Sequence, residues 1–281
     1  MDRRTERTVV THISNSSAGH ERRRRTDHLV VEEPLTIRLD GALVATTMRT
    51  PGDDFELAAG LCFTDGLLGD ATITSVRYCS DGSTMLQIGR DAEPLRDGNV
   101  VSVETGGRAP APTPRLGNVS SSCGWCGNDQ LDAMCARLDP LPSGEPFDLD
   151  VLRCVPDSVA AQQPLFAETG SVHAAAAFDR DGRILVVRED VGRHNAVDKV
   201  VGSFVLEHDG PTGARDRRTG ELGLFVSGRA SIEMVQKAWA GGFGALVAVS
   251  APTALAVSAA RRANLTLAGF VRSHGFNLYV P

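Results

Sequence analysis

The chain contains 281 residues, of which 42% are hydrophobic, and it carries a formal net charge of -6. This length fits one large domain or two of moderate size, and the composition is sufficient for a substantial core. A negative net charge argues against nucleic-acid binding by the molecule as a whole, and no segment is long and apolar enough to span a membrane or to act as a secretory signal. We therefore expect a cytoplasmic protein with no nucleic-acid or membrane partner.

The N-terminal part changes character near residue 29. Residues 1–28 are polar and include a run of four arginines, a composition that predicts a disordered tail. Apolar residues over 34–39 and 42–48, on either side of Gly41, then predict two strands and a turn.

A helix should begin at Asp53, which can cap it, because Glu56 follows at the spacing of a capping box. Cys62 continues the helical repeat of small and apolar residues, so we expect it to be a buried packing residue. Short alternating segments over 72–104 predict further strands. Together these elements predict a smaller α+β domain over 29–140, ending in a loop that carries two cysteines.

Strands and helices alternate in the second half of the chain. Strands are predicted at 183–190, 222–226, 245–249 and 265–271, with helices from about Asn195, at 231–240 and at 252–263. This alternation predicts an α/β domain over 147–281, with a mostly parallel sheet and flanking helices. The chain as a whole is then α+β.

Two of the six cysteines, Cys123 and Cys126, lie close together in the segment SSSCGWCG. A structural zinc site would need four ligands, and there is no second pair. A thioredoxin-like disulfide normally follows a strand and opens a helix, whereas this pair follows a proline-rich loop. A persulfide carrier needs an exposed, nucleophilic thiol on a flexible loop. The pair alone does not decide between these chemistries.

Four turns in the second half follow predicted strands: DVGRHN (190–195), SGRAS (227–231), SAPT (250–253) and FVRSHGFN (270–277). In a parallel sheet such turns gather at the carboxyl ends of the strands, where open α/β folds bind ligands. Helix N-termini attract anions, and arginines or histidines occur in three of the four turns. The pattern indicates a pocket for a phosphate-rich ligand.

Five motifs in this order resemble the formate dehydrogenase accessory sulfurtransferase family, FdhD/NarQ: RTPGDD (49–54), SCGWCG (122–127), EDVGRHNAVDK (189–199), SGRAS (227–231) and VSAPT (249–253). The resemblance runs from about residue 29 to the C-terminus. It implies a sulfur carrier that accepts persulfide sulfur from a cysteine desulfurase. The carrier would pass this sulfur to molybdenum bis(molybdopterin guanine dinucleotide) before the cofactor enters formate dehydrogenase. It also implies a homodimer and a fold similar to that of cytidine deaminases.

The resemblance places the persulfide on Cys123, and we expect Cys126 to be the second catalytic thiol. Cofactor contacts are expected from the C-terminal residues that match the family, Phe270, Val271, Arg272, Ser273, His274 and Gly275. Further contacts are expected from the strand-end turns, at Arg193, His194, Ser227, Gly228 and Arg229. Guanine nucleotides should bind as partial mimics of the cofactor, and no metal ligands are predicted. The arginine-rich tail and the charged loop at 209–221 look specific to this chain.

Two other functions remain open at this point. A non-catalytic cofactor chaperone would need the pocket but not the thiols, so substitution of Cys123 distinguishes it from a sulfurtransferase. A zinc deaminase would need H-x-E followed by P-C-x-x-C. Here His173 is followed by two alanines and the cysteine pair precedes it, which makes deamination the less favoured alternative.

Overall fold

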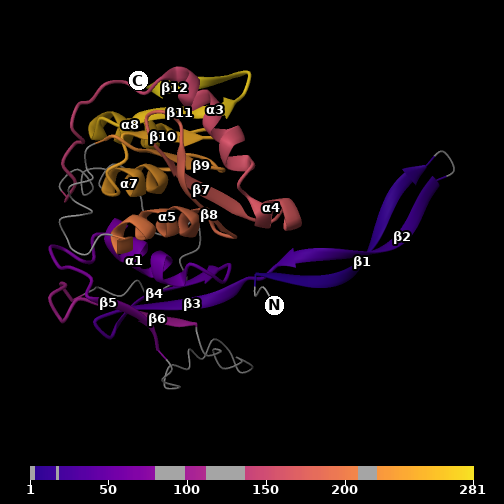
Figure 1. The fold of residues 1–281 in the computed structure, drawn as a ribbon, viewed down its shortest axis with the longest axis horizontal. Helices are drawn as coiled ribbons and strands as arrows, with labels where there is room; N and C mark the ends of the chain where they lie inside the picture. The colour runs from indigo at the N-terminus through magenta and orange to yellow at the C-terminus, as the bar shows by residue number, and fades with distance from the viewer. Residues whose placement is uncertain (1–3, 17–18, 80–98, 112–136, 208–219) are drawn as a thin grey trace.

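The computed structural model describes residues 4–16, 19–79, 99–111, 137–207 and 220–281, which form three sheets with flanking helices (Figure 1). A two-stranded arm extends from a body that contains a four-stranded sheet and a six-stranded sheet. No helix within these residues is long and apolar enough to cross a membrane.

The arm is formed by two strands within residues 4–16 and 19–30, so the prediction of a disordered tail is wrong for these residues. Its strands are β1 (Thr5–Ser16) and β2 (Gly19–Val30). They pair antiparallel along their whole length, from Thr5 opposite Val30 to Ser16 opposite Gly19. The β-branched Thr, Val and Ile residues of β1 have high strand propensity, and pairing with this strand orders the arginine run on the other side.

The N-terminal domain is a four-stranded sheet in the order β4-β3-β6-β5, with one helix packed on it. Its elements are β3 (Glu33–Leu39), β4 (Ala42–Arg49), α1 (Asp54–Thr64), β5 (Ser75–Tyr78) and β6 (Val100–Glu104). The predicted hairpin is confirmed. Asp40 and Gly41 connect its strands with φ angles of 48° and 82°, the left-handed pair that a tight hairpin turn requires.

Two expectations for α1 had different outcomes. Cys62 is completely buried, as predicted, and burial raises the pKa of its thiol. The predicted capping box is wrong, because Asp53 itself has a φ of 54° and its side chain makes no capping hydrogen bond. Glu56 instead accepts a hydrogen bond of 2.7 Å from Arg188 of the C-terminal domain.

The C-terminal domain is built on a six-stranded sheet in the order β12-β11-β10-β9-β7-β8. Its strands are β7 (His173–Phe178), β8 (Ile184–Asp190), β9 (Gly223–Val226), β10 (Ala245–Ala248), β11 (Thr266–Arg272) and β12 (Gly275–Val280). β8, β9, β10 and β11 run in one direction, while β7 and β12 run in the other. The mixed α/β fold is confirmed, although the two antiparallel strands make the sheet less parallel than predicted.

Helices cover both faces of this sheet (Figure 1). α5 (Arg193–Glu207), α7 (Ile232–Ala240) and α8 (Ala254–Ala263) share one core with the sheet, and α3 (Leu149–Ala160) shares another on the opposite face. The short α4 (Pro164–Thr169) follows α3. Alternate residues of each strand face opposite cores, as Leu224 and Phe225 of β9 illustrate.

The two domains meet where α1 crosses α5, and two glycines bring the helix backbones together. A Cβ atom added at Gly60 would lie 1.9 Å from the carbonyl oxygen of Asp198. One added at Gly202 would lie 1.8 Å from the carbonyl oxygen of Glu56. Neither position can therefore hold a side chain unless the helices separate.

Both lysines of the chain lie buried at this interface. Lys199 Nζ is 2.9 Å from Asp190 Oδ2 and donates a hydrogen bond of 3.0 Å to the carbonyl oxygen of Thr50. Lys237 Nζ is 2.7 Å from Asp198 Oδ1. Since a buried charge is costly without a partner, each pair depends on both of its members.

Candidate functional site

Six strand ends of the C-terminal sheet meet at one edge. β8, β9, β10 and β11 end there, and β7 and β12 begin there, with His173 opposite Asp190 and Ala248 opposite Val226. A bridge between Ala230 and Pro252 joins the turns after β9 and β10. The structure therefore brings the four predicted turns together at one edge, while the ligand they bind stays a prediction.

Three helices begin at the same edge, and their first backbone N–H groups have no partner within the helix. α5 starts at Arg193, α7 at Ile232 and α8 at Ala254, each directly after one of the turns. The partial positive charges of the three N-termini add to those of the basic side chains around them. This edge can therefore attract an anionic ligand although the whole chain is acidic.

Asp190 fixes the first turn. Its buried carboxylate accepts hydrogen bonds from the N–H groups of Thr50 (3.2 Å) and Gly192 (2.8 Å) and from Asn195 Nδ2 (2.9 Å), and it also pairs with Lys199. The turn is thus tied to the N-terminal domain. From the sequence, this motif was predicted to bind a ligand, and its second role in joining the domains was missed. The rarity of lysine, which occurs only twice in the chain, was a signal that could have indicated it.

Arg193 lies against the turn after β9. A Cβ atom added at Gly228 would be 3.4 Å from Arg193 Cδ, so the arginine side chain runs close to this glycine. The Nε atom of Arg193 is a buried donor for which the described residues provide no acceptor. An unsatisfied buried donor costs about 1–3 kcal/mol. An oxygen atom of a ligand would satisfy it.

His194 is held by the start of α7. Its Nε2 atom lies 3.3 Å from Glu233 Oε2, and the hydroxyl of Ser231 donates to the same oxygen at 2.7 Å. The hydrogen bond with His194, assisted by that of Ser231, lowers the pKa of Glu233 to about 2. The carboxylate is therefore ionised at neutral pH and keeps the imidazole in place.

His173, at the start of β7, belongs to the same group. The hydroxyl of Ser227 accepts a hydrogen bond of 2.9 Å from the N–H of Ala174 and lies 3.2 Å from His173 Nδ1. Burial lowers the pKa of His173, and the charges of Arg193 and His194 lower it further, so its ring is neutral near pH 7. If Ser227 donates to Nδ1, then Nε2 carries the proton and can act as a donor at the edge. His173 was not among the cofactor-binding residues predicted from the sequence.

The β11–β12 connection completes the edge with a strained aromatic residue. Phe270 has a φ of 55° and is 46% exposed. This backbone conformation is unfavourable for a bulky residue, and such strain concentrates at functional positions. Arg272 lies beside it and donates from Nη1 to the carbonyl oxygens of Val249 (2.6 Å) and Val271 (2.7 Å).

Among the predicted residues of this connection, Val271 does not face the edge. Its side chain is completely buried in the core beneath α3, and its carbonyl oxygen already accepts from Arg272. It therefore cannot contact a ligand with its side chain, and its inclusion among the cofactor-binding residues was wrong in that respect. Arg229, Ser273 and His274 are exposed.

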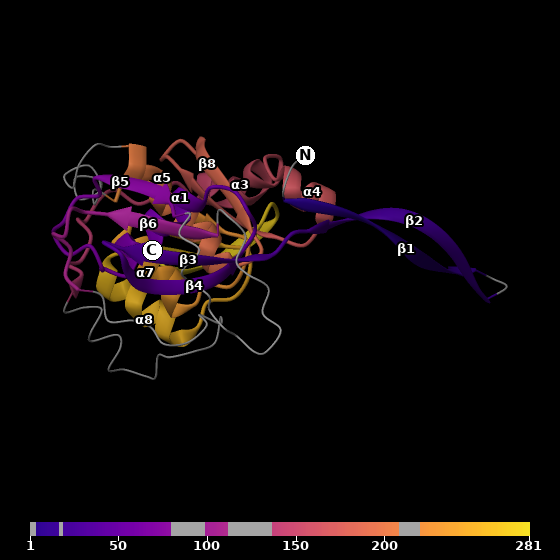
Figure 2. The same cartoon turned by 90° about the horizontal axis from the view of Figure 1, so that it is seen from below.

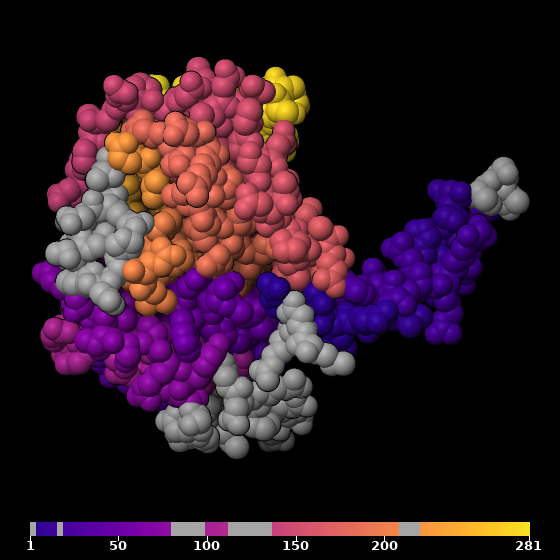
Figure 3. Space-filling model, viewed as in Figure 1, coloured from indigo at the N-terminus to yellow at the C-terminus, as the bar shows by residue number. Residues whose placement is uncertain are grey.

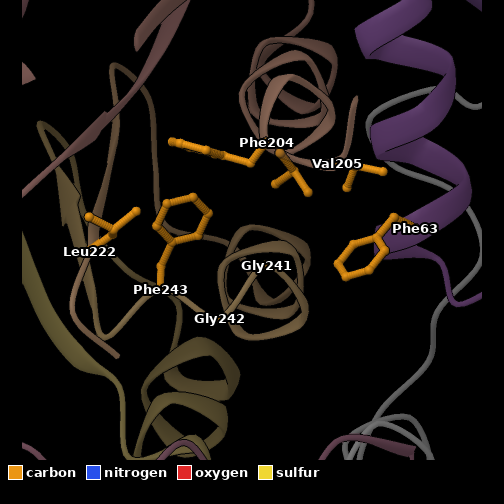
Figure 4. Close-up of a pocket in the computed structure, with 8 residues that line it drawn as sticks. Phe63, Phe204, Val205, Leu222, Gly241, Gly242 and Phe243 are labelled. Atoms are coloured by element: carbon orange, nitrogen blue, oxygen red, sulfur yellow. The ribbon is translucent and has the colours of Figure 1, made fainter. Parts of the chain in front are cut away.

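An apolar hollow elsewhere in the domain does not belong to this site. It lies between the second half of α5 and the end of α7 (Figure 4), whereas the strand-end edge lies at the first residues of these helices. Its volume of about 20 Å³ is close to that of a single water molecule. Phe63, Phe204 and Phe243 line it, and most of its lining residues are half-buried, so it is a small apolar hollow that opens to the surface.

Cys123 and Cys126 lie outside the described residues. Within the part of the chain that the structure describes, no three His, Cys, Asp or Glu side chains are arranged to hold a metal ion.

Comparison with known proteins gives consistent matches. The model of the FdhD/NarQ family matches residues 30–281. The sulfur carrier protein FdhD of Mycolicibacterium paratuberculosis is 41% identical over 98% of this chain and 96% of its own length. That of Streptomyces coelicolor is 43% identical over 99% and 95%. These alignments include almost the whole chain, whereas the family model starts at residue 30, after the arginine run.

A solved structure shares the fold. It is a protein of Desulfotalea psychrophila assigned as a formate dehydrogenase accessory protein, which superposes with a TM-score of 0.71 at 21% identity. The superposition covers 98% of this chain and 97% of the other.

Proposed function

The chain belongs to the FdhD/NarQ family, and on that premise we propose that it is a cytoplasmic sulfur carrier for formate dehydrogenase maturation. Sulfur would arrive as a persulfide on Cys123 from a cysteine desulfurase. It would then pass to molybdenum bis(molybdopterin guanine dinucleotide) before this cofactor is inserted into formate dehydrogenase. The relatives that carry the name sulfur carrier protein FdhD, at 41–43% identity over nearly the whole chain, are the observation that carries the proposal.

The loading step is a thiol exchange. The Cys123 thiolate attacks the terminal sulfur of the desulfurase persulfide, a new S–S bond forms on Cys123, and the desulfurase cysteine leaves as a thiolate. No external electrons are needed, because the transferred sulfur keeps its oxidation state.

Release of the sulfur as sulfide needs two electrons, and Cys126 can supply them. Attack of the Cys126 thiolate on the Cys123 sulfur expels hydrosulfide and leaves a disulfide between the two residues. A cellular dithiol reductant would then restore both thiols. The two-residue spacing of the pair suits such an exchange.

The strand-end edge is the proposed binding surface for the cofactor. Its phosphates would meet the N-termini of α5, α7 and α8 together with Arg193, whose Nε atom lacks an acceptor within the described residues. A planar ring of the cofactor would stack on the exposed side chain of Phe270. Guanine nucleotides should bind as partial mimics, and we expect the carrier to act as a homodimer.

Intact-protein mass spectrometry tests the loading step. After incubation with a cysteine desulfurase and cysteine, Cys123 should carry one additional, reducible sulfur atom. The variant Cys123→Ala should neither gain it nor activate formate dehydrogenase, while Cys154→Ala, which removes an exposed cysteine of α3, should behave like the wild type. A fully active Cys123→Ala variant would instead support a chaperone that holds the cofactor without transferring sulfur.

A further inference from the structure

The β1–β2 arm is an unusual element because it extends away from the rest of the molecule. Figures 1 and 2 show it leaving the body beside α4 and running outward, and in Figure 3 its outer part stands clear of the body surface. Each of its strands has 12 residues. A two-stranded hairpin without further packing is at best marginally stable in water.

The base of the arm fixes its direction. The N–H of Val31 donates to the carbonyl oxygen of Arg4 at 2.8 Å, and β3 starts only two residues after Val31. Thr5 and His28 both bond to Glu168 of α4. These contacts direct the arm outward, and its outer part stands away from its own body.

The outer part of the arm carries apolar and cationic side chains on the same face. Val9 and Ile13 are 58% and 55% exposed, and the register places them opposite Thr26 and Arg22. Arg24 lies between these two positions on the same face. Exposed β-branched side chains beside arginines are typical of a surface that is covered by a partner.

The charge of the chain indicates which partner. Residues 1–30 contain seven arginines and four acidic residues, a net charge of +3, so the remaining residues carry -9 of the total of -6. A second copy of this chain therefore offers an acidic body to a basic arm. Two copies can exchange arms around a twofold axis, which forms every arm contact twice. A nucleic acid fits less well, because the acidic body would repel its phosphates.

We propose that the arm docks on the body of a second copy of this chain, in a reciprocal exchange. The inference extends the homodimer of the proposed function by naming the surface that forms it. The tests of docking measure contact between two copies, whereas the mass-spectrometric test measures sulfur on Cys123, so either proposal can succeed or fail independently.

Photo-crosslinking tests the contact directly in the full-length protein. With Ile13→p-benzoylphenylalanine, irradiation of the purified protein should give an adduct of twice the chain mass, with the crosslink on residues beyond 30 of the second copy. An adduct confined to a single chain would overturn the proposal.

Sedimentation equilibrium tests the energetics. Arg22→Ser combined with Arg24→Ser should raise the dimer dissociation constant roughly ten- to a thousandfold, because the reciprocal exchange then loses four partly exposed ion pairs per dimer. Val9→Thr with Ile13→Thr keeps strand propensity and should also weaken the dimer. The matched control, Arg261→Ser with Arg262→Ser on α8, should leave it unchanged, whereas 0.5 M salt should weaken the wild type.

Three outcomes would contradict the docking model. The first is a wild-type protein that stays monomeric over the whole concentration range. The second is an equal dissociation constant for the arm variants and the control. The third is a monomeric protein that binds a DNA duplex and loses this binding when Arg22 and Arg24 are replaced. The last would identify the arm as a nucleic-acid contact.

Discussion

The α1–α5 interface and the strand-end edge share the segment 189–199 but have opposite chemistry. At the interface, Lys199 and Lys237 are buried and paired with aspartates, and glycines let the backbones touch. At the edge, Arg193 has a buried donor without an acceptor among the described residues, and Arg229 is exposed. One sequence motif therefore serves domain assembly with its two ends, Asp190 and Lys199, while Arg193 and His194 between them lie at the proposed binding edge.

The largest loss of stability should come from adding a side chain where α1 crosses α5. Gly202→Val would force a branched side chain into the carbonyl of Glu56 and should destabilise the fold by roughly 3 kcal/mol or more. Urea unfolding measures this loss. Gly228→Ala is the matched change at the edge, and it should be tolerated because its Cβ would meet Arg193 at an ordinary 3.4 Å. If both variants lost the same free energy of unfolding, the α1–α5 interface and the strand-end edge would not differ in their tolerance of a side chain.

The second-largest loss of stability should come from removing one member of a buried ion pair. Lys199→Met leaves the buried carboxylate of Asp190 without its cation and should cost roughly 3 kcal/mol. The double variant with Asp190→Asn should recover part of the lost free energy of unfolding. A double-mutant cycle measured by urea unfolding would show this recovery. Additive losses would mean that the two residues do not act as a pair.

At the edge, the expected loss is in binding and not in stability. Arg229→Ala should weaken guanosine diphosphate binding by roughly ten- to hundredfold, equivalent to about 1.5–3 kcal/mol for a charged contact. The free energy of unfolding should change by less than about 0.5 kcal/mol, because the side chain is exposed. Calorimetry measures the first and urea unfolding the second, and persulfide loading at Cys123 should be normal. Wild-type nucleotide affinity in this variant would exclude Arg229 from the binding surface.

The smallest effect concerns the pH dependence of stability through Glu233. Its pKa of about 2 in the folded protein lies below the ordinary 4.5, so it stabilises the fold above about pH 4.5 and loses this contribution as the pH falls toward 2. Glu233→Gln should therefore cost more at pH 6 than at pH 3. The difference should be below about 1 kcal/mol, since the pair is half-exposed and screened by solvent. A loss that is the same at both pH values would show that the hydrogen bonds, and not the charge, matter.

The sequence predicted those parts of the molecule whose signals are local. The turn at Asp40 and Gly41, the buried Cys62 and the four strand-end turns follow from short patterns of residue type. The arm was missed because a composition rule for disorder outweighed the strand propensity of β1. His173 was missed for another reason. Its place at the site depends on β7 lying between β8 and β9, and this strand order is set by contacts across the whole sheet.

The close approach of Gly60 and Gly202 has a consequence for motion. With no side chains between the two backbones, α1 cannot slide or rotate against α5 without collision, and the hydrogen bonds from the buried Lys199 to the Thr50 carbonyl and from Lys237 to the Thr64 hydroxyl oppose any separation. The two domains therefore behave as one rigid frame. This arrangement differs from that of enzymes whose two lobes close around a ligand by a hinge motion.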